Sequence, residues 1–306
     1  MLLCTTPAEM TAACRALRVQ ERGLSAPEHA PTLGLVPTMG ALHAGHLSLV
    51  TTARAQCDLV AASIFVNPTQ FGPGEDFTRY PRTFDADCAQ LESAGVDILF
   101  APSAETMYPS GNATFVDPGP IAERLDGASR PGHFRGVATI VTRLFSIVQP
   151  DRAYFGQKDA AQVAVLRQIT RDLNLPVELF VCPTVRESDG LAMSSRNRYL
   201  SPAERLRARV LYRALSAARE LAESGQSLSD RPDADTLRAA MLNALDLPDP
   251  SPEAGAIPIR LDYAAVVDPD TLLPLTDTSR GALLAIAAFV GATRLIDNIL
   301  LPPRSV

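Results

Sequence analysis

The first 180 or so residues alternate short apolar runs with amphipathic stretches. Runs such as 59–66 (LVAASIFV) have the length and composition of buried strands, whereas stretches such as 137–148 repeat apolar side chains with a helical period. Strands that alternate with helices of about 10–15 residues predict crossover units and a parallel sheet. We therefore expect an α/β protein whose residues 1–186 form a Rossmann-like, doubly wound parallel sheet.

Individual elements follow from the same pattern. The expected strands are 33–36, 59–66, 96–100, 153–155 and 177–181. The expected helices are 47–57, 84–94, 137–148 and 163–173. Because ligands of such sheets bind beyond the carboxyl ends of the strands, the loops that follow these strands are where we expect the chemistry.

The pattern changes after residue 186. The expected elements there are a long amphipathic helix at 202–221, a polar break at 225–232, a second helix at 237–245, a proline-rich loop at 248–258, and strands at 259–267, 283–289 and 294–300. Helices followed by a short run of strands predict a smaller C-terminal α+β domain, residues 187–306, which we expect to act as a lid.

Composition narrows the class of protein. Hydrophobic residues make up 46% of the 306 residues, which is enough for a core and excludes a disordered chain. With 28 Lys and Arg against 34 Asp and Glu, the formal charge is −6, which disfavours a general nucleic-acid-binding protein. The five cysteines form no CxxC pair and only four histidines are present, so neither a disulfide scaffold nor a structural zinc site is expected.

No membrane segment is expected either. The most apolar run, 281–293, is flanked by arginines and is shorter than the roughly 20 residues that span a bilayer. The first ten residues lack the basic and apolar regions of a signal peptide. Since scattered thiols suit a reducing compartment, we expect a cytoplasmic protein that binds small molecules and neither membranes nor nucleic acids.

The segment 36–47 (VPTMGALHAGHL) joins a strand to a helix through a glycine-containing turn. A helix that starts near Gly45 presents free backbone N–H groups and the positive end of its dipole beside this turn. His43 and His46 are three residues apart and therefore share a face of the first helical turn. Two imidazoles there can donate hydrogen bonds to the phosphates of a nucleotide; the alternative is a turn whose histidines only cap and pack.

Another predicted strand runs directly into the loop 65–76 (FVNPTQFGPGED). The amides of Asn67 and Gln70 can bind a ligand with hydroxyl and carboxylate groups without adding charge, although such residues are also common in ordinary turns. Downstream, Asp85 and Asp87 lie near a helix start. Carboxylates there either stabilise the helix dipole or bind Mg²⁺.

Three cationic loops complete the set. The segment 130–137 (RPGHFRGV) is a glycine turn with two arginines, which either bind an anion or remain solvated. Lys158 follows a strand and stands at a helix start, which is unfavourable for a cation unless an anion binds there. Further on, Ser194 and Ser195 beside Arg196 form a flexible polar clamp suited to a triphosphate.

Together these loops offer amides, imidazoles, a lysine and arginines, and the chain has no Ser-His-Asp arrangement or nucleophilic cysteine motif. Such a set stabilises phosphate charge and does not form an acyl-enzyme. The residues themselves therefore favour nucleotidyl transfer, in which the α-phosphate of ATP is attacked in line. Ser201 and Glu204, by contrast, have the spacing of a capping box and are expected to be structural.

Five motifs within residues 33–200 occur in the order found in pantothenate synthetases (pantoate–β-alanine ligases), a family of the HxGH nucleotidylyltransferase superfamily. They are PTMGALHAGH, FVNPTQFGPGED, RPGHFRGV, YFGQKD with Gln162, and GLAMSSRNRYL. The chain closely resembles this family, which implies ATP-dependent condensation of (R)-pantoate with β-alanine through pantoyl adenylate, with release of AMP and diphosphate. The resemblance also implies a place in pantothenate and coenzyme A biosynthesis, Mg²⁺ as the metal that accompanies ATP, and a homodimer.

The resemblance assigns roles to individual residues. The implied catalytic residues are His46, His43, Lys158 and Arg196. The implied ATP-binding residues are Met39, Gly40, Ala41, Leu42, His43, Ala44, Gly45, His46, Gly156, Gln157, Lys158, Asp159, Val185, Met193, Ser194, Ser195 and Arg196. Those implied to bind pantoate and β-alanine are Gln70, Gln162 and Asn67, and the one implied to bind the metal is Asp87.

Two departures from the family pattern bear on these roles: Ala44 stands where many members have Glu, and Ala86 stands where Asp is common. Two other functions fit the same loops. A nucleotidyltransferase that releases a stable CDP- or ADP-linked product would not require β-alanine, and a nucleotide-sensing regulator would bind ATP without turnover. The residues implied to be catalytic are all present, which favours a working enzyme.

Overall fold

The computed structural model describes residues 1–24, 30–224, 231–246 and 257–303. These residues fold into two compact units. The first unit contains 1–122, 130–156 and 165–183, and the second contains 123–129, 157–164 and the chain from 184 onward.

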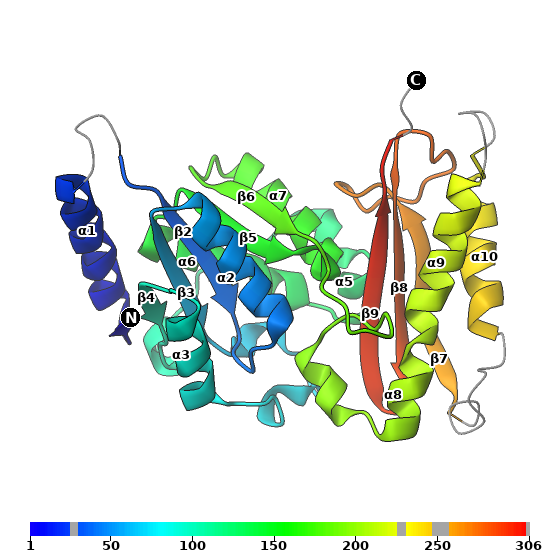
Figure 1. The fold of residues 1–306 in the computed structure, drawn as a ribbon, viewed down its shortest axis with the longest axis horizontal. Helices are drawn as coiled ribbons and strands as arrows, with labels where there is room; N and C mark the ends of the chain where they lie inside the picture. The colour runs from blue at the N-terminus through cyan, green and yellow to red at the C-terminus, as the bar shows by residue number, and fades with distance from the viewer. Residues whose placement is uncertain (25–29, 225–230, 247–256, 304–306) are drawn as a thin grey trace. The chain divides into compact units, whose positions relative to one another are not determined.

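The first unit is built on a parallel sheet. Its strands are β1 (Leu2–Cys4), β2 (Leu33–Thr38), β3 (Leu59–Ile64), β4 (Ile98–Phe100), β5 (Arg152–Gly156) and β6 (Glu178–Cys182). Their spatial order is β1-β4-β3-β2-β5-β6, and every pair of neighbours runs parallel (Figure 1). The doubly wound parallel sheet predicted from the sequence is therefore confirmed.

Helices cover both faces of this sheet. They are α1 (Pro7–Leu24), α2 (Ala44–Gln56), α3 (Phe84–Ser93), α4 (Ala104–Met107), α6 (His133–Val148) and α7 (Ala160–Asp172), with short 3₁₀ turns η1 (Pro68–Gln70), η2 (Asp76–Thr78) and η3 (Gly119–Glu123). On one face, Leu49 and Val50 of α2 and Leu91 of α3 join a buried cluster with Val36 and Val60 of the sheet. In Figure 1, α2 and α3 lie in front of the strands and α6 lies behind them.

The strand order reverses between β2 and β5. These two strands are paired neighbours, yet β3 lies on the far side of β2 and β6 on the far side of β5. Ligands of doubly wound sheets bind at this place, beyond the carboxyl ends of the strands. The chain leaves β2 at Thr38 into the loop that carries His43, and it leaves β5 at Gly156. Two of the loops with predicted phosphate contacts therefore begin at adjacent strand ends.

The second unit combines helices with a small antiparallel sheet. Its elements are α5 (Asp126–Ser129), η4 (Gln157–Asp159), η5 (Ser195–Tyr199), α8 (Pro202–Ala208), α9 (Val210–Glu223), α10 (Ala234–Asp246), β7 (Ile259–Val267), β8 (Ala282–Val290) and β9 (Thr293–Leu301). The strands pair in the order β7-β8-β9. Leu211, Leu215 and Leu237 of the helices are buried in one cluster with Leu284 and Ile286 of β8. This arrangement confirms the predicted C-terminal α+β fold.

Some elements differ from those expected from the sequence. Strand β1 and helix α1 are absent from the expected set. The expected helix at 202–221 is divided into α8 and α9, because the amide and the Nε of Arg209 both donate to the carbonyl of Leu206, three residues earlier. Ser201 and Glu204 do form the expected capping box. Most of the expected loop at 248–258 and of the break at 225–232 lies outside the described residues.

Segments 123–129 and 157–164 belong to the second unit, although both precede residue 186 in the chain. Segment 123–129 is held in the second unit by Asp126, whose carboxylate pairs with Arg294 of β9 at 2.8 Å and accepts from the Tyr263 hydroxyl at 3.1 Å. Among the helices that the structure describes, none is both long and apolar enough to cross a lipid bilayer. All five cysteines are free thiols, and four of them are buried.

Candidate active site

The loop after β2 turns sharply at Gly40 and Ala41, whose φ angles are 78° and 50°. Glycine adopts such angles without steric cost, whereas alanine needs support from its surroundings. Asp87 of α3 gives that support: its Oδ2 accepts from the Ala41 amide and its Oδ1 from the Leu42 amide, each at 2.9 Å. The Thr83 hydroxyl donates to Oδ1 at 3.1 Å. This carboxylate is only 1% exposed, so it fixes the loop from inside the protein.

These contacts bear on three of the roles expected from the sequence. The amides of Ala41 and Leu42 donate to Asp87, so these two residues fix the shape of the loop after β2. Asp87 has both carboxylate oxygens in hydrogen bonds with protein donors, which suits a structural carboxylate and not the expected metal ligand. Within the described parts of the chain, no group of three or more His, Cys, Asp or Glu side chains is arranged to hold a metal ion.

His43 is the N-cap residue of α2, and its Nδ1 accepts a hydrogen bond from the Gly45 amide at 3.1 Å. A ring nitrogen that accepts carries no hydrogen, so the proton of the neutral imidazole lies on Nε2. The rings of His43 and His46 are 4.1 Å apart between centroids and tilted by 35°. Capping therefore fixes His43 in the tautomer whose outer nitrogen donates, and a capping role and a phosphate-binding role are compatible for this residue.

Gln70 in η1 contacts the loop after β2 directly. Its Nε2 donates to the Sδ of Met39 at 2.9 Å, and its Oε1 accepts from Nδ2 of Asn67 at 3.2 Å. Asn67 is 1% exposed, and its Oδ1 accepts from the hydroxyls of Tyr108 at 2.8 Å and Thr69 at 2.9 Å. Burial raises the pKa of Tyr108, so the phenol keeps its proton and remains a donor. Asn67 thus orients Gln70, and Tyr108 orients Asn67.

Helix α6 packs closely against this turn at Gly136. A Cβ atom at Gly136 would lie 2.3 Å from the carbonyl oxygen of Thr69 and 2.7 Å from the amide nitrogen of Gln70. The Nδ2 of Asn67 also donates to the carbonyl of Gly136 at 3.1 Å. Only glycine permits this approach, because the neighbouring atoms belong to the backbone and cannot move aside easily. The glycine of the RPGHFRGV motif therefore helps to place Gln70.

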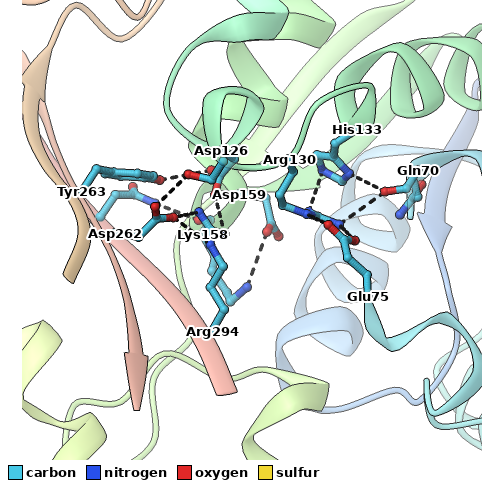
Figure 2. A network of polar contacts seen from close by, with 12 residues as sticks. Gln70, Glu75, Asp126, Arg130, His133, Lys158, Asp159, Asp262, Tyr263 and Arg294 are labelled. Carbon is cyan, nitrogen blue, oxygen red and sulfur yellow. Dashed lines mark hydrogen bonds and ion pairs between the residues drawn. The ribbon is translucent and has the colours of Figure 1, made fainter. Parts of the chain in front are cut away.

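Arg130 and His133 of the RPGHFRGV motif form hydrogen bonds with the loop that contains and follows Gln70 (Figure 2). The Arg130 guanidinium donates to both carboxylate oxygens of Glu75, at 2.7 and 2.8 Å. Its Nη1 lies 3.0 Å from Nε2 of His133, whose Nδ1 lies 2.8 Å from the Gln70 carbonyl oxygen. Since a guanidinium only donates and a carbonyl only accepts, these contacts suit a His133 ring that donates from Nδ1 and accepts at Nε2. The sequence leaves open whether Arg130 meets an anion, and the structure shows Glu75 as its partner.

In the second unit, Lys158 lies in η4, directly before α7. Its ammonium is 3.4 Å from the Asp159 carboxylate, and its side chain is 21% exposed (Figure 2). Gln162 lies in the first turn of α7 and belongs to the same unit. A partly exposed cation at this position can meet an anionic ligand.

The predicted clamp also lies in the second unit. The Met193 amide donates to the carbonyl of Val185 at 3.0 Å, and the segment between these residues contains an antiparallel bridge. Ser194 caps η5, with its Oγ accepting from the Arg196 amide at 3.3 Å. Ser195 is buried. Capping therefore fixes the backbone from which the Arg196 side chain extends.

Side chains with predicted phosphate contacts occur in both units. Imidazoles, amides, an ammonium and a guanidinium stabilise negative charge that develops on phosphates. The predicted site residues are divided between the units: the first contains Met39, His43, His46, Asn67, Gln70 and Gly156, and the second contains Gln157, Lys158, Gln162, Val185, Met193, Ser194 and Arg196.

Comparison with known proteins decides the family. The family model for pantoate-beta-alanine ligases matches residues 3–300. The chain belongs to the pantoate–β-alanine ligase family. A pantothenate synthetase from Acidobacterium capsulatum is 57% identical over 298 residues, which cover 97% of this chain and 95% of that protein. One from Koribacter versatilis is 53% identical over 301 residues, which cover 98% of this chain and 96% of that protein.

Solved structures agree with this pantoate–β-alanine ligase assignment. The crystal structure of pantothenate synthetase from Thermus thermophilus has a TM-score of 0.85 and 50% identity, and the match covers 99% of this chain and 100% of that one. The pantoate–β-alanine ligase from Francisella tularensis, complexed with βγ-ATP and β-alanine, has a TM-score of 0.74 and 32% identity, covering 98% and 97%. The family, the fold class and the ligase class predicted from the sequence are therefore confirmed.

The role of Asp87 leads to a first prediction. In Asp87→Asn, the side chain can accept from only one of the two loop amides and turns a donor toward the other. Hydrogen bonds to charged groups contribute about 1.5–3 kcal/mol. We therefore expect kcat/KM for ATP to fall about tenfold or more. Steady-state kinetics at several Mg²⁺ concentrations measure this effect. The exposed Asp85→Asn in the same helical turn is the control and should stay within about twofold. Recovery of Asp87→Asn in excess Mg²⁺ would instead indicate a metal ligand.

Proposed function

We propose that this member of the pantoate–β-alanine ligase family condenses pantoate with β-alanine at the expense of ATP, through a pantoyl-adenylate intermediate. The observation that carries the proposal is the contact between Gln70 and Met39, which joins a ligand-type amide to the loop that ends at the paired imidazoles of His43 and His46. The proposed places for a phosphate and for a hydroxy acid thus lie on two loops of the first unit that contact each other through Gln70 and Met39.

In the first step, the carboxylate of pantoate attacks the α-phosphorus of ATP, and diphosphate leaves. The Nε2–H of His43 and the ring of His46 donate to the phosphates, assisted by the N-terminus of α2. Lys158 and Arg196 neutralise the charge that develops on the leaving diphosphate. The other proposed ATP contacts are Met39, Gly40, Ala44, Gly45, Gly156, Gln157, Asp159, Val185, Met193, Ser194 and Ser195.

The proposal requires residues of both units to act on one ATP. Its support lies in the connectivity of the chain. β2 and β5 are paired neighbours, and the bond from Gly156 to Gln157 leads directly from the end of β5 into the turn that carries Lys158. The turn that carries Lys158 therefore begins where β5 ends, and β5 is the neighbour of the strand whose loop carries His43.

In the second step, the amine of β-alanine attacks the acyl carbon of pantoyl adenylate, and AMP leaves. A free carboxylate resists attack by amines, whereas AMP is a good leaving group, so adenylation makes the amide bond possible. We propose that Gln70 and Gln162 hold the pantoyl group through hydrogen bonds from their amides, and that Gln70 also lies near β-alanine. Asn67, which is buried, contributes by holding Gln70.

Pantoyl adenylate must be protected from water, and we propose residues 71–76 as the lid that does so. Phe71 packs edge-on against Phe77 and Tyr80, with ring centroids 5.3 and 6.0 Å apart. At the other end of the segment, Glu75 is held by Arg130. Opening this lid would require breaking that ion pair.

A second prediction tests the lid. Glu75→Gln removes the charge that binds Arg130, so we expect the ratio of AMP to pantothenate at limiting β-alanine to rise at least about threefold, as water reaches more of the intermediate. Glu178→Gln, at an exposed ion pair with Arg152, is the matched control and should leave the ratio unchanged. An unchanged ratio in Glu75→Gln would remove the lid role from this ion pair.

The charge state of Glu75 sets the pH range for that comparison. Burial alone would raise its pKa, but the hydrogen bond and charge of Arg130 together hold the pKa below the ordinary value for a glutamate. A carboxylate with a lowered pKa contributes stability that is complete above its unfolded pKa, about 4.3, and is lost as the pH falls through the folded value. The ion pair is therefore intact throughout the neutral range in which the assay is run.

We propose that Mg²⁺ enters with ATP and is held mainly by the phosphate oxygens. The described residues form no carboxylate cage for it, and the donors of the candidate site suit phosphates and not a cation. Mg²⁺ commonly keeps several waters and binds through substrate phosphates, which fits this donor set.

We also propose that the enzyme works as a homodimer in the cytoplasm. Leu2 and Leu3 of the edge strand β1 are 49% and 52% exposed, an apolar edge that a second copy could cover. The five free thiols suit a reducing compartment. The mass measured by light scattering after size-exclusion chromatography tests the dimer.

The activity itself is tested by leaving out one substrate at a time. With ATP, Mg²⁺ and pantoate alone, we expect at most one diphosphate per active site plus slow leakage, and continuous AMP and pantothenate formation only when β-alanine is added. Continuous release of a stable nucleotide conjugate without β-alanine would favour a simple nucleotidyltransferase. ATP binding without diphosphate would favour a nucleotide-sensing regulator.

A further inference from the structure

Asn298 lies in β9, the last strand of the second unit, and is 4% exposed. It is distant in sequence from every motif discussed above. A buried asparagine needs partners for both its amide hydrogens and its oxygen, because an unpaired polar group in the interior costs free energy. The hydrogen-bond partners of Asn298 therefore indicate its structural role.

The Asn298 side chain forms its hydrogen bonds with the turn that carries Lys158. Its Nδ2 donates to the carbonyl oxygen of Gln157 at 2.9 Å and to that of Lys158 at 2.8 Å. Its Oδ1 accepts from Nε2 of Gln157 at 3.0 Å. One side chain thus binds two successive carbonyls of η4 and the side chain of its first residue.

The residue before Asn298 fixes the neighbouring loop in the same way. Asp297 is 3% exposed and accepts from both terminal nitrogens of Arg186, at 2.6 and 2.9 Å. Arg186 also donates to the carbonyl oxygens of Gly190 at 3.1 Å and Asn298 at 3.3 Å. Because all these residues belong to the second unit, one short stretch of β9 supports both the Lys158 turn and the start of the segment that leads to Arg196.

We infer that Asn298 is a positioning residue for Lys158, and that β9 therefore organises the cationic side of the active site. This inference rests on the proposed function. Among the described residues, the Lys158 ammonium has one weak ion pair, with Asp159 at 3.4 Å, so its position depends largely on its backbone. Two hydrogen bonds from a rigid amide on a sheet strand hold that backbone, which places the ammonium for the phosphates before ATP arrives.

A double-mutant cycle tests this role. Asn298→Ala leaves the carbonyls of Gln157 and Lys158 without their donor, and we expect it to lower the rate of pantoate-dependent diphosphate release about thirtyfold. In a Lys158→Ala background, the same substitution should cost less than threefold, because the group that Asn298 positions is already gone. Asn298→Asp provides a second variant, because aspartate has nearly the same shape but turns an oxygen toward the two carbonyls. Its rate loss should likewise be large with Lys158 present and small in the Lys158→Ala background.

A structural role alone would give a different result. The control is Leu284→Ala in the core of the second unit, or Ile286→Val if the first does not fold; both remove core packing without touching the Lys158 turn. The control should lower the melting temperature yet stay within threefold of the wild-type rate at 25 °C. The inference is supported if Asn298→Ala or Asn298→Asp lowers the rate of diphosphate release by a factor that is at least ten times larger with Lys158 present than in the Lys158→Ala background. A smaller difference overturns it.

The two proposals fail differently. If the wild-type enzyme releases no diphosphate from ATP and pantoate, the proposed function is wrong. If the wild-type enzyme releases diphosphate but the two substitutions are additive, the function stands and the positioning role of Asn298 is wrong.

Discussion

His46→Ala is expected to lower the rate of pantoate-dependent diphosphate release by at least about a hundredfold, which corresponds to about 2.7 kcal/mol of transition-state stabilisation. His46 lies in the first turn of α2, where the helix dipole favours a negative ligand, and its ring is 4.1 Å from that of His43. Alanine removes the only hydrogen-bonding group of this side chain and leaves the helix itself intact. We therefore expect the loss mainly in the rate of diphosphate formation at saturating ATP and pantoate.

The measurement is a diphosphate-release assay at saturating ATP and pantoate, with the melting temperature as a check on folding. Thr51→Ala is the matched control, since Thr51 is an exposed residue of the same helix and its hydroxyl donates only to the Leu47 carbonyl. The control should keep at least half of the wild-type rate. A His46→Ala enzyme with a rate close to the wild type would remove this histidine from catalysis.

Lys158→Ala is expected to have an effect of similar size, about a hundredfold to a thousandfold on the same rate, since one donor to a developing charge contributes that much in comparable enzymes. The ammonium is expected to act on the leaving diphosphate, so the loss should appear in the adenylation step. The KM for β-alanine should change by less than about threefold, because the amine reacts after diphosphate has left.

Arg171→Ala is the control for removing a cation. Arg171 lies in the last turn of α7 and its side chain is 71% exposed. This variant should lie within about twofold of the wild type in both rate and KM. If Lys158→Ala lowered the rate no more than Arg171→Ala does, the proposed contact with the phosphates would be wrong.

The elements that the sequence predicts well are those encoded by local signals. The capping box of Ser201 and Glu204 lies within four residues, and the start of α2 near Gly45 follows from the adjacent glycine turn and histidines. Helix α1 carries a comparable signal, since Thr6 and Glu9 exchange capping hydrogen bonds around Pro7. The same reasoning, applied to the first ten residues, indicates that helix.

The contacts that orient the candidate site are less accessible to sequence reasoning, because they join distant positions. Asp87 supports Ala41 across 46 residues, and Asn298 holds Gln157 across 141. No periodicity or spacing indicates such partners. For Asp87 the local pattern fits two roles, because a carboxylate near a helix start can bind a metal or can accept hydrogen bonds from a neighbouring loop, as Asp87 does from the amides of Ala41 and Leu42.

The two departures from the family pattern lie at positions where the structure tolerates them. Ala44 and Ala86 are both exposed. Neither side chain takes part in the hydrogen bonds through which Asp87 holds the nucleotide loop or Asn67 holds Gln70. We therefore expect these alanines to leave the adenylation chemistry in place.

A single-turnover experiment follows the α-phosphate of ATP through both steps of the reaction. Enzyme in excess over ATP labelled at the α-phosphate is mixed with Mg²⁺ and pantoate, without β-alanine, and quenched at short times. We expect the label to move from ATP into pantoyl adenylate, with one diphosphate formed for each, and added β-alanine then to convert the adenylate to AMP and pantothenate. Label that remains in ATP until β-alanine is present, or that appears in ADP, would contradict this expectation.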